Sequence, residues 1–394
     1  MRASGVEALK MTYNFDNPPS RRGTACYKWS CRENELPMWV ADMDFEAAPT
    51  IRAALQRRLD HGIFGYDDMG DAWYEAYICW WRDRHGLTME RENLIFSSGV
   101  VASLSSLVRK LTTPNENVLI QTPVYNIFFN SIVNNGARVL ESPLRYDGTD
   151  WSIDFADLEA KLADPQTTVM ILCNPHNPVG RIWSRDELAR IGALCKKHHV
   201  TVLSDEIHCD LTAPGVGYVP FAAVDETCRA ISITCIAPTK TFNLAGLHTS
   251  AVYAADPVLH HKAWRALNTD EVAEPNCFAA PATVAAFTEG GDWLDAARAY
   301  IWENKRLVQD FAQRELPGVK VRVSEATYLL WVDVSALTDN VRDFTDRLRA
   351  ETGLWVTAGT VYGESGEGFF RWNLACPRST VEDGLNRLKQ FLKK

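Results

Sequence analysis

The sequence lacks the short motifs that identify several common enzyme classes. The patterns HExxH, GxSxG, GxGxxG and the phosphate-binding P-loop are all missing from the 394 residues, and no two of the ten cysteines form a Cys-x-x-Cys pair. These absences argue against a zinc hydrolase, a serine hydrolase, a P-loop NTPase and a standard dinucleotide dehydrogenase. No internal repeat is visible either, so a repeat architecture is not expected.

The chain also has little positive charge and no long apolar run. Lysine and arginine total 41 against 50 aspartates and glutamates, which gives a net charge of −9. A nucleic-acid partner and a basic membrane-binding patch are therefore not expected. Apolar runs such as residues 169–173 are far shorter than the roughly 20 residues of a membrane helix, so no membrane association is predicted. The first residues contain no apolar signal segment, and we expect a cytoplasmic protein.

What is present is an ordinary globular composition. Hydrophobic residues make up 46% and charged residues 23% of a length that suits two domains. Most cysteines lie inside apolar stretches, as Cys173, Cys235 and Cys376 do, which predicts reduced and buried thiols. We predict a large domain over residues 51–285. Residues 1–50, an irregular arm with several prolines, and residues 286–394 form the remainder.

Short apolar runs alternate with helical periods through the large domain. The pattern predicts helices from about residue 50 and over 74–84, and then the strands 93–96, 117–121, 168–173, 200–203 and 230–236, with helices over 100–112, 125–134 and 184–198. Such alternation predicts an α/β fold with a mostly parallel sheet covered by helices on both faces. Ligands of these sheets bind at the carboxyl ends of the strands.

The last third of the chain has a different character. A long helix over 293–315 is predicted first. It is followed by strands at 319–323 and 328–334, a helix over 341–352, a Gly-rich loop over 359–368, a strand at 369–374 and a closing helix over 381–392. This order of elements predicts a smaller α+β domain.

Polar residues with chemical potential follow several of the predicted strands. The segment Ser97-Ser98-Gly99-Val100-Val101 leads from a strand into a helix, whose free N–H groups suit a phosphate, although a glycine that only serves the turn explains it as well. Residues 174–180 place Asn177 between two prolines in a stiff loop. That amide can face a ligand oxygen, or the loop can be an ordinary Asx-rich turn.

Three charged residues occupy positions that need a partner. Asp205 ends a strand, where it is either an N-cap or a buried carboxylate with a cationic partner. Lys240 directly follows another strand, and a desolvated lysine readily forms a Schiff base, whereas a lysine that reaches the surface is the simpler alternative. Arg371 lies inside an apolar strand, where a structural ion pair and a bound carboxylate explain it equally well.

Together these residues indicate one chemistry. A phosphate site, an amide, a carboxylate, a Schiff-base lysine and a carboxylate-binding arginine are the parts that a pyridoxal 5′-phosphate enzyme acting on amino acids requires. A carboxylate at Asp205 would keep the pyridine nitrogen protonated, and the ring could then accept electrons.

The order of these motifs resembles the fold-type I pyridoxal-phosphate enzymes of the class I/II aminotransferase superfamily. More closely, the sequence resembles the MalY/PatB-type cystathionine β-lyases, the C–S lyase branch. The stretches that carry this resemblance span the chain from about residue 20 to the end: 36–45, 65–66, 174–180, 204–211, 239–247 and 371–377. Among them WVADMDF, SDEIHCDL and KTFNLAGL distinguish the branch from ordinary transaminases.

The resemblance implies roles for residues around the cofactor ring. Lys240 would form the Schiff base and then act as the catalytic base, and Asp205 would pair with the pyridine nitrogen. Asn177 would bind the phenolic oxygen, with His208 close by, where many transaminases carry a tyrosine. Tyr125 would stack on the ring, and both it and Asn177 would also face the substrate.

The resemblance also implies a phosphate site, a carboxylate site and an oligomer. The phosphate would be held by Gly99, Val100, Val101 and Thr239. Arg371 would bind the α-carboxylate of the substrate. Tyr66 would reach the phosphate of the neighbouring subunit, so a homodimer with active sites at the subunit interface is implied.

Two positions depart from the pattern of the wider family. Three residues before Lys240, many relatives carry a serine that contacts the phosphate, and here the residue is Ala237. Eight residues after the lysine, transaminases usually carry an arginine, and here it is His248. We therefore expect phosphate binding to depend more strongly on the helix N-terminus and on Tyr66.

The implied reaction is α,β-elimination from cystathionine or a related cysteine thioether, which yields pyruvate, ammonia and a thiol such as homocysteine. An aminotransferase on the same scaffold is the alternative, and no single residue decides between the two. A pyridoxal-phosphate-binding protein with a regulatory protein partner is a third possibility, because some relatives combine lyase activity with repression of a transcription activator.

Overall fold

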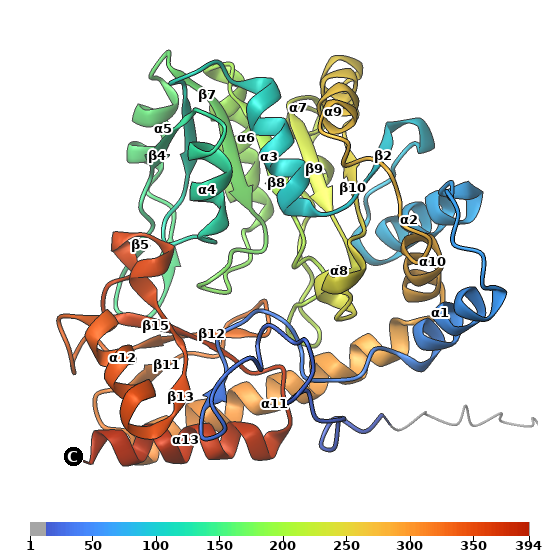
Figure 1. Ribbon diagram of the computed structural model, residues 1–394. Helices are drawn as coiled ribbons and strands as arrows, with labels where there is room; N and C mark the ends of the chain where they lie inside the picture. Colours follow the sequence, from blue (N-terminus) through green and yellow to red (C-terminus); the bar gives the residue numbers. More distant parts are fainter. Residues whose placement is uncertain (1–12, 394) are drawn as a thin grey trace, which may run out of the picture.

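The computed structural model describes residues 13–393, and its larger sheet confirms the predicted α/β fold (Figure 1). Within these residues the larger sheet contains seven strands. Neighbouring strands run parallel except at β10, which is antiparallel to both of its neighbours. In spatial order the strands are β2 (Leu94–Ser97), β10 (Ser250–Tyr253), β9 (Ser232–Ile236), β8 (Thr201–Asp205), β7 (Thr167–Cys173), β3 (Asn117–Ile120) and β4 (Arg138–Glu141).

Both faces of this sheet are buried, as the near-continuous apolar strands predict. Successive side chains of β7 point to opposite faces: Val169 and Ile171 join one core cluster, and Met170 and Leu172 join another. The first cluster packs under α3 (Val100–Leu111), α4 (Ile127–Val133) and α9 (Pro257–Thr269), and the second under α5 (Phe155–Leu162) and α6 (Arg185–Lys197).

Further helices surround this core. They are α1 (Pro49–His61), α2 (Gly70–His85), α7 (Glu226–Ala230), the single turn α8 (Pro238–Thr241) and α10 (Ala279–Glu289). Helix α6 begins with the expected capping box, in which Ser184 and Glu187 bond to each other's backbone N–H groups. Strands β5 (Arg145–Tyr146) and β6 (Trp151–Ser152) form a two-stranded hairpin, and Tyr146 and Trp151 contact Phe369 in the C-terminal third of the chain.

The C-terminal third contains a second, antiparallel sheet with helices around it, as expected for an α+β unit. Its strands are β11 (Lys320–Val321), β12 (Leu329–Asp333), β15 (Phe369–Asn373) and β14 (Thr357–Ala358), and its helices are α11 (Gly291–Glu315), α12 (Val341–Thr352) and α13 (Arg378–Leu392). Strand β1 (Leu36–Pro37) pairs with β13 (Leu354–Trp355), so the N-terminal arm packs on this region (Figure 1). The boundary near residue 285 stays a prediction.

Some predicted boundaries were wrong. Strand β11 has two residues instead of five, and α4 begins at Ile127, so that Tyr125 lies in the preceding turn. The Gly-rich loop contains two short 3₁₀ helices, η4 (Gly359–Tyr362) and η5 (Glu364–Gly366). Short strands such as β4 and β10 give a weak periodic pattern and were not predicted. Among residues 13–393, no helix combines the length and apolar character needed to cross a bilayer.

Candidate active site

Most of the predicted site residues line one cavity at the carboxyl ends of the parallel strands. The cavity has a volume of about 170 Å³. Its lining includes nine of the residues predicted from the sequence: Gly99, Val100, Val101, Tyr125, Asn177, Asp205, His208, Thr239 and Lys240. They lie at the end of, or in the segment directly after, strands β2, β3, β7, β8 and β9, so the parallel register of the sheet assembles the cavity.

The first turn of α3 closes one end of the cavity. Gly99 is the N-cap, and no side chain of the described residues caps the free N–H groups of this end. Val100 and Val101 therefore present backbone donors, and the helix dipole adds partial positive charge. This end of the cavity is suited to a phosphate.

Asp205 lines the cavity and has few polar contacts. It is 4% exposed, and one oxygen accepts a hydrogen bond from the Ile207 N–H at 3.1 Å. Cys173 and Cys235 are its register neighbours on the two adjacent strands. Burial raises the pKa of Asp205 to about 7, which indicates that the carboxylate lacks a strong cationic partner. A pyridinium nitrogen would provide one.

Lys240 lies on α8, and its side chain reaches the irregular segment that contains Ala41. Its Nζ donates to the Ala41 carbonyl at 2.6 Å, and the Tyr328 hydroxyl donates to the same oxygen at 2.8 Å. Burial, with a smaller contribution from the positive charge of Arg371, lowers the pKa of Lys240 to about 8. A lysine with such a pKa has an appreciable neutral fraction near neutral pH, which both Schiff-base formation and base catalysis need.

Arg371 adjoins the cavity through Asn177. Its Nη1 donates to Asn177 Oδ1 at 3.2 Å, its Nη2 donates to the Trp39 carbonyl at 3.1 Å, and its guanidinium lies 4.7 Å from the Tyr362 ring centre. Its buried Nε finds no hydrogen-bond partner in the described part of the chain. No carboxylate is bonded to this guanidinium among those residues, so a substrate carboxylate can take that place.

Two further groups in the cavity are neutral. Burial lowers the pKa of His208 to about 3, and its buried Nδ1 has no hydrogen-bond partner within residues 13–393. Burial raises the pKa of Tyr125 to about 12. The unpartnered imidazole nitrogen and the buried carboxylate in the cavity, the unpartnered guanidinium N–H that adjoins it and the open first turn of α3 fit a polar aromatic cofactor that carries a phosphate.

The structure does not bring Tyr66 to this cavity. Its side chain is fully exposed, and it is absent from the described residues that line the cavity. Sequence reasoning missed Ala41, which lines the cavity, and Tyr328, which bonds to its carbonyl. The WVADMDF match contains Ala41, but a backbone carbonyl leaves no mark in a sequence. His248, flagged as a departure from the family, lines the cavity.

Comparisons with known proteins agree with this geometry. The family model "Aminotransferase class I and II" matches residues 36–388. The chain belongs to the class I and II aminotransferase family. It is 43% identical over 385 residues to cystathionine beta-lyase PatB of Bacillus subtilis, with 96% of this chain and all of that protein covered.

Two solved structures place the chain in the C–S lyase branch. Cystalysin from Treponema denticola, which contains pyridoxal 5′-phosphate, superposes with a TM-score of 0.94 at 32% identity over 97% of this chain and 99% of that one. The pyridoxal-phosphate-bound C–S lyase from Staphylococcus hominis gives 0.91 at 34% identity, with the same coverage of both chains. The branch is of the MalY/PatB type, and the cofactor is pyridoxal 5′-phosphate, which the residues of the cavity fit.

Proposed function

We propose that this protein catalyses α,β-elimination of L-cystathionine or a related cysteine thioether, with pyruvate, ammonia and a thiol as products. The protein is a pyridoxal-phosphate-dependent C–S lyase of the cystathionine β-lyase type, and the proposal concerns its substrate and the residues that act. The observation that supports it most is the placement of Lys240, with its lowered pKa, in the same cavity as the Asn177 amide to which Arg371 is bonded.

The substrate would be held by its α-carboxylate. Arg371 would bind that carboxylate, and the bond to Asn177 keeps the guanidinium oriented toward the cavity. Lys240 would then take the proton from the substrate Cα at its Nζ. Once bound, pyridoxal phosphate supplies a ring that withdraws electrons from Cα, so that the bond from Cβ to sulfur can break.

The cofactor itself would be held by groups at both ends of the cavity. The first turn of α3, with Thr239, would bind the phosphate. Asp205 would keep a proton on the pyridine nitrogen, and Asn177 and His208 would face the phenolic oxygen, with Tyr125 against the ring. The burial and position of Lys240 and Asp205 support these proposed roles, as the family motif does.

A homodimer is part of the proposal. Tyr66 would bind the phosphate in the partner subunit, because its exposed side chain cannot serve its own cavity. The apolar side chains beside it are also exposed: Leu59 at 52%, Ile63 at 67% and Phe64 at 54%. Such a run on a surface suits contact with a second copy. A cytoplasmic location stays a prediction, and cleavage of such thioethers would place the enzyme in methionine and cysteine metabolism.

The test is pyruvate release from L-cystathionine by the purified, cofactor-loaded protein without any keto acid. We expect steady pyruvate with one free thiol per turnover. A requirement for a keto acid would contradict the lyase proposal and favour the aminotransferase. The variant Lys240→Ala should lose the activity, and a rate within about tenfold of wild type would refute the assignment of Lys240.

A further inference from the structure

Residues 38–45, which we call the strap, cross between Lys240 and Arg371 without forming a helix or a regular strand. The backbone of the strap contacts both residues. The Ala41 carbonyl accepts the bond from Lys240 Nζ, and the Trp39 carbonyl accepts the bond from Arg371 Nη2. A short irregular segment therefore contacts the two groups on which the proposed reaction depends.

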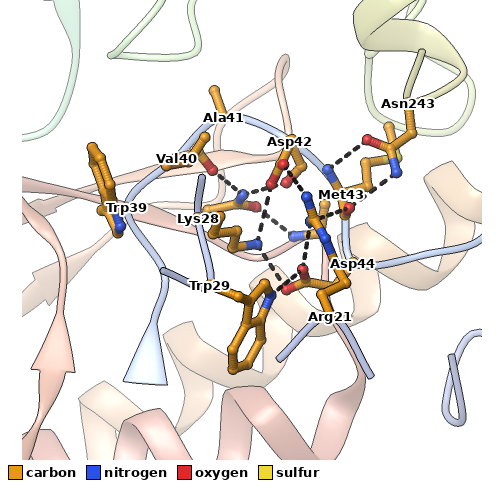
Figure 2. Close-up of polar contacts among 12 residues, drawn as sticks. Arg21, Lys28, Trp29, Trp39, Val40, Ala41, Asp42, Met43, Asp44 and Asn243 are labelled. Carbon is orange, nitrogen blue, oxygen red and sulfur yellow. Dashed lines mark hydrogen bonds and ion pairs between the residues drawn. The ribbon is translucent and has the colours of Figure 1, made fainter. Parts of the chain in front are cut away.

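Asn243 anchors the strap to the part of the chain that carries the large sheet. Its Oδ1 accepts from the Met43 N–H at 3.0 Å, and its Nδ2 donates to the carbonyls of Met43 at 2.9 Å and Phe45 at 3.0 Å (Figure 2). Asn243 follows Lys240 by three positions and has φ = 58°, a left-handed conformation that asparagine tolerates better than most residues. The chain that carries Lys240 is therefore tied directly to the strap.

Asn373, on strand β15 of the smaller sheet, anchors the same segment. It lies two positions after Arg371 on β15 and is 1% exposed. Its Nδ2 donates to the carbonyls of Val40 at 2.5 Å and Asp42 at 2.6 Å, and its backbone N–H donates to the Met38 carbonyl at 2.9 Å. Two asparagine amides thus hold the strap on either side of Ala41.

The side chains of the strap have anchors of their own. Asp44 accepts from Lys28 Nζ at 2.7 Å, Arg21 Nη1 at 2.8 Å and Trp29 Nε1 at 2.8 Å, and Asp42 accepts from Arg21 Nη2 at 2.6 Å (Figure 2). These bonds anchor the side chains of Asp42 and Asp44. They make no contact with the Ala41 carbonyl; Asn373 holds the carbonyls on either side of it, and Asn243 holds the segment that follows.

We propose that Asn243 and Asn373 are positioning residues: they fix the strap so that the Ala41 carbonyl orients the amine of Lys240 for proton transfer at the substrate Cα. The proposal rests on the proposed function only in that Lys240 is the base. A base must hold its lone pair within hydrogen-bond reach of the proton, and a displacement of about 1 Å can reduce a rate about a hundredfold. Tyr328, which donates to the same carbonyl at 2.8 Å, also restrains its position.

The test uses the holoenzyme and the variant Asn243→Gly. Glycine keeps the left-handed backbone accessible and removes only the amide. Proton transfer is measured as the incorporation of solvent deuterium at the Cα of L-alanine, which has no β-leaving group. We expect exchange at saturating L-alanine to fall about 10- to 100-fold. Hydrogen exchange of the peptide covering residues 38–45, followed by mass spectrometry, should become faster.

The matched control is Asn135→Gly. Asn135 also uses its side-chain amide, which donates to Ser105 Oγ and the Ser131 carbonyl, and it lies after α4, away from the cavity. It should leave both measurements unchanged. If Asn243→Gly does not fold, Asn243→Asp removes the two donated bonds with little change of shape, and the same slowing of alanine exchange is expected.

Two results would overturn the proposal. In the first, the strap peptide exchanges faster in Asn243→Gly but alanine exchange keeps its wild-type rate, which would make the grip purely structural. In the second, the strap peptide is unaffected. Failure of the proposed function is distinguishable, because a wild-type enzyme that exchanges the Cα proton of alanine yet releases no pyruvate from cystathionine would contradict the substrate and leave the positioning of Lys240 intact.

Discussion

The cavity around Lys240 has two sides that are built in different ways. On the sheet side, Asn177, Asp205 and Thr239 follow strands whose parallel ladders fix their relative positions. On the strap side, residues 38–45 have no ladder of their own; a few isolated backbone bonds, at Met38 and Asp44 for example, and several side chains hold them. The sheet side is supported by continuous backbone ladders, whereas the strap depends more strongly on side chains. Substitutions on the sheet side should therefore change the chemical groups that face the cofactor, whereas substitutions on the strap side should change the position of the strap.

The largest effect is expected on the sheet side. Asp205→Asn removes the group that would keep the pyridine nitrogen protonated, and we expect kcat/KM to fall by roughly a thousandfold. The same variant should stabilise the cofactor-free protein. The difference between the ordinary aspartate pKa of 3.8 and about 7 corresponds to a cost of about 4 kcal/mol above pH 7.

The pH dependence of this stability has a definite sign. Because the folded pKa of Asp205 is raised, the folded state holds a proton that the unfolded state releases, and stability is lost as pH rises from about 4 to 7. The melting temperature of Asp205→Asn should exceed that of the wild type most at pH 8 and much less at pH 4. Equal differences at both values would show that burial does not raise this pKa, and would remove the contrast between the two sides.

An intermediate effect is expected on the strap side. Lys28 is 1% exposed and bonds to Asp44, so Lys28→Met leaves a buried carboxylate with one cation fewer. We expect a loss of about 2–4 kcal/mol in the free energy of unfolding, measured in urea, and a roughly tenfold lower rate of pyruvate release as the strap shifts. The chemistry of the cavity is untouched, so cofactor absorbance should be unchanged.

A surface pair provides the control for this variant. Lys197 bonds to Glu159 with side-chain exposures of 61% and 40%, and Lys197→Met should cost less than about 1 kcal/mol. If the two lysine variants lose equal stability, the strap does not depend on single side chains. The double variant Lys28→Met/Asp44→Asn should recover part of the loss, because it removes the buried carboxylate that has lost one of its two cationic partners.

The smallest effect on activity is expected at Tyr66, which does not line the cavity of its own subunit. Tyr66→Phe removes one hydroxyl that would bind the partner's phosphate, and we expect the dissociation constant of pyridoxal phosphate to rise about fivefold. Reconstitution of the cofactor-free protein, followed by absorbance, measures this. Tyr27→Phe, at another largely exposed tyrosine (74%), should behave as wild type. Tighter cofactor binding by Tyr66→Phe would count against the proposed phosphate contact.

The same division explains how much could be predicted from the sequence. Asp205, Lys240 and Asn177 were found because each follows an apolar strand, and the carboxyl ends of parallel strands meet at one edge. The approach of Arg371 to that edge could only be inferred through the family resemblance. Its strand lies in the other sheet, and no periodic pattern specifies how two sheets face each other.

The contacts of the strap could not be predicted from the hydrophobic periodicity of the sequence. Its bonds to Lys240 and Arg371 come from the backbone carbonyls of Ala41 and Trp39, which every residue type provides equally. Asn243 and Asn373 stood inside the recognised motifs, yet nothing in their spacing indicated a shared target. The destination of Tyr66 lies outside a single chain, so the position of its side chain is informative only once a second copy is considered.

The grip of Asn373 on the strap also has a consequence for the order of assembly. The bonds from Asn373 to Val40 and from Arg371 to Trp39 span 333 and 332 residues. The strap can form these bonds only after the chain as far as β15 has been synthesised, whereas the strands of the large sheet are complete by Tyr253. The large sheet can therefore form first, and the contact between the strap and β15, which helps to close the cavity, is a later folding event.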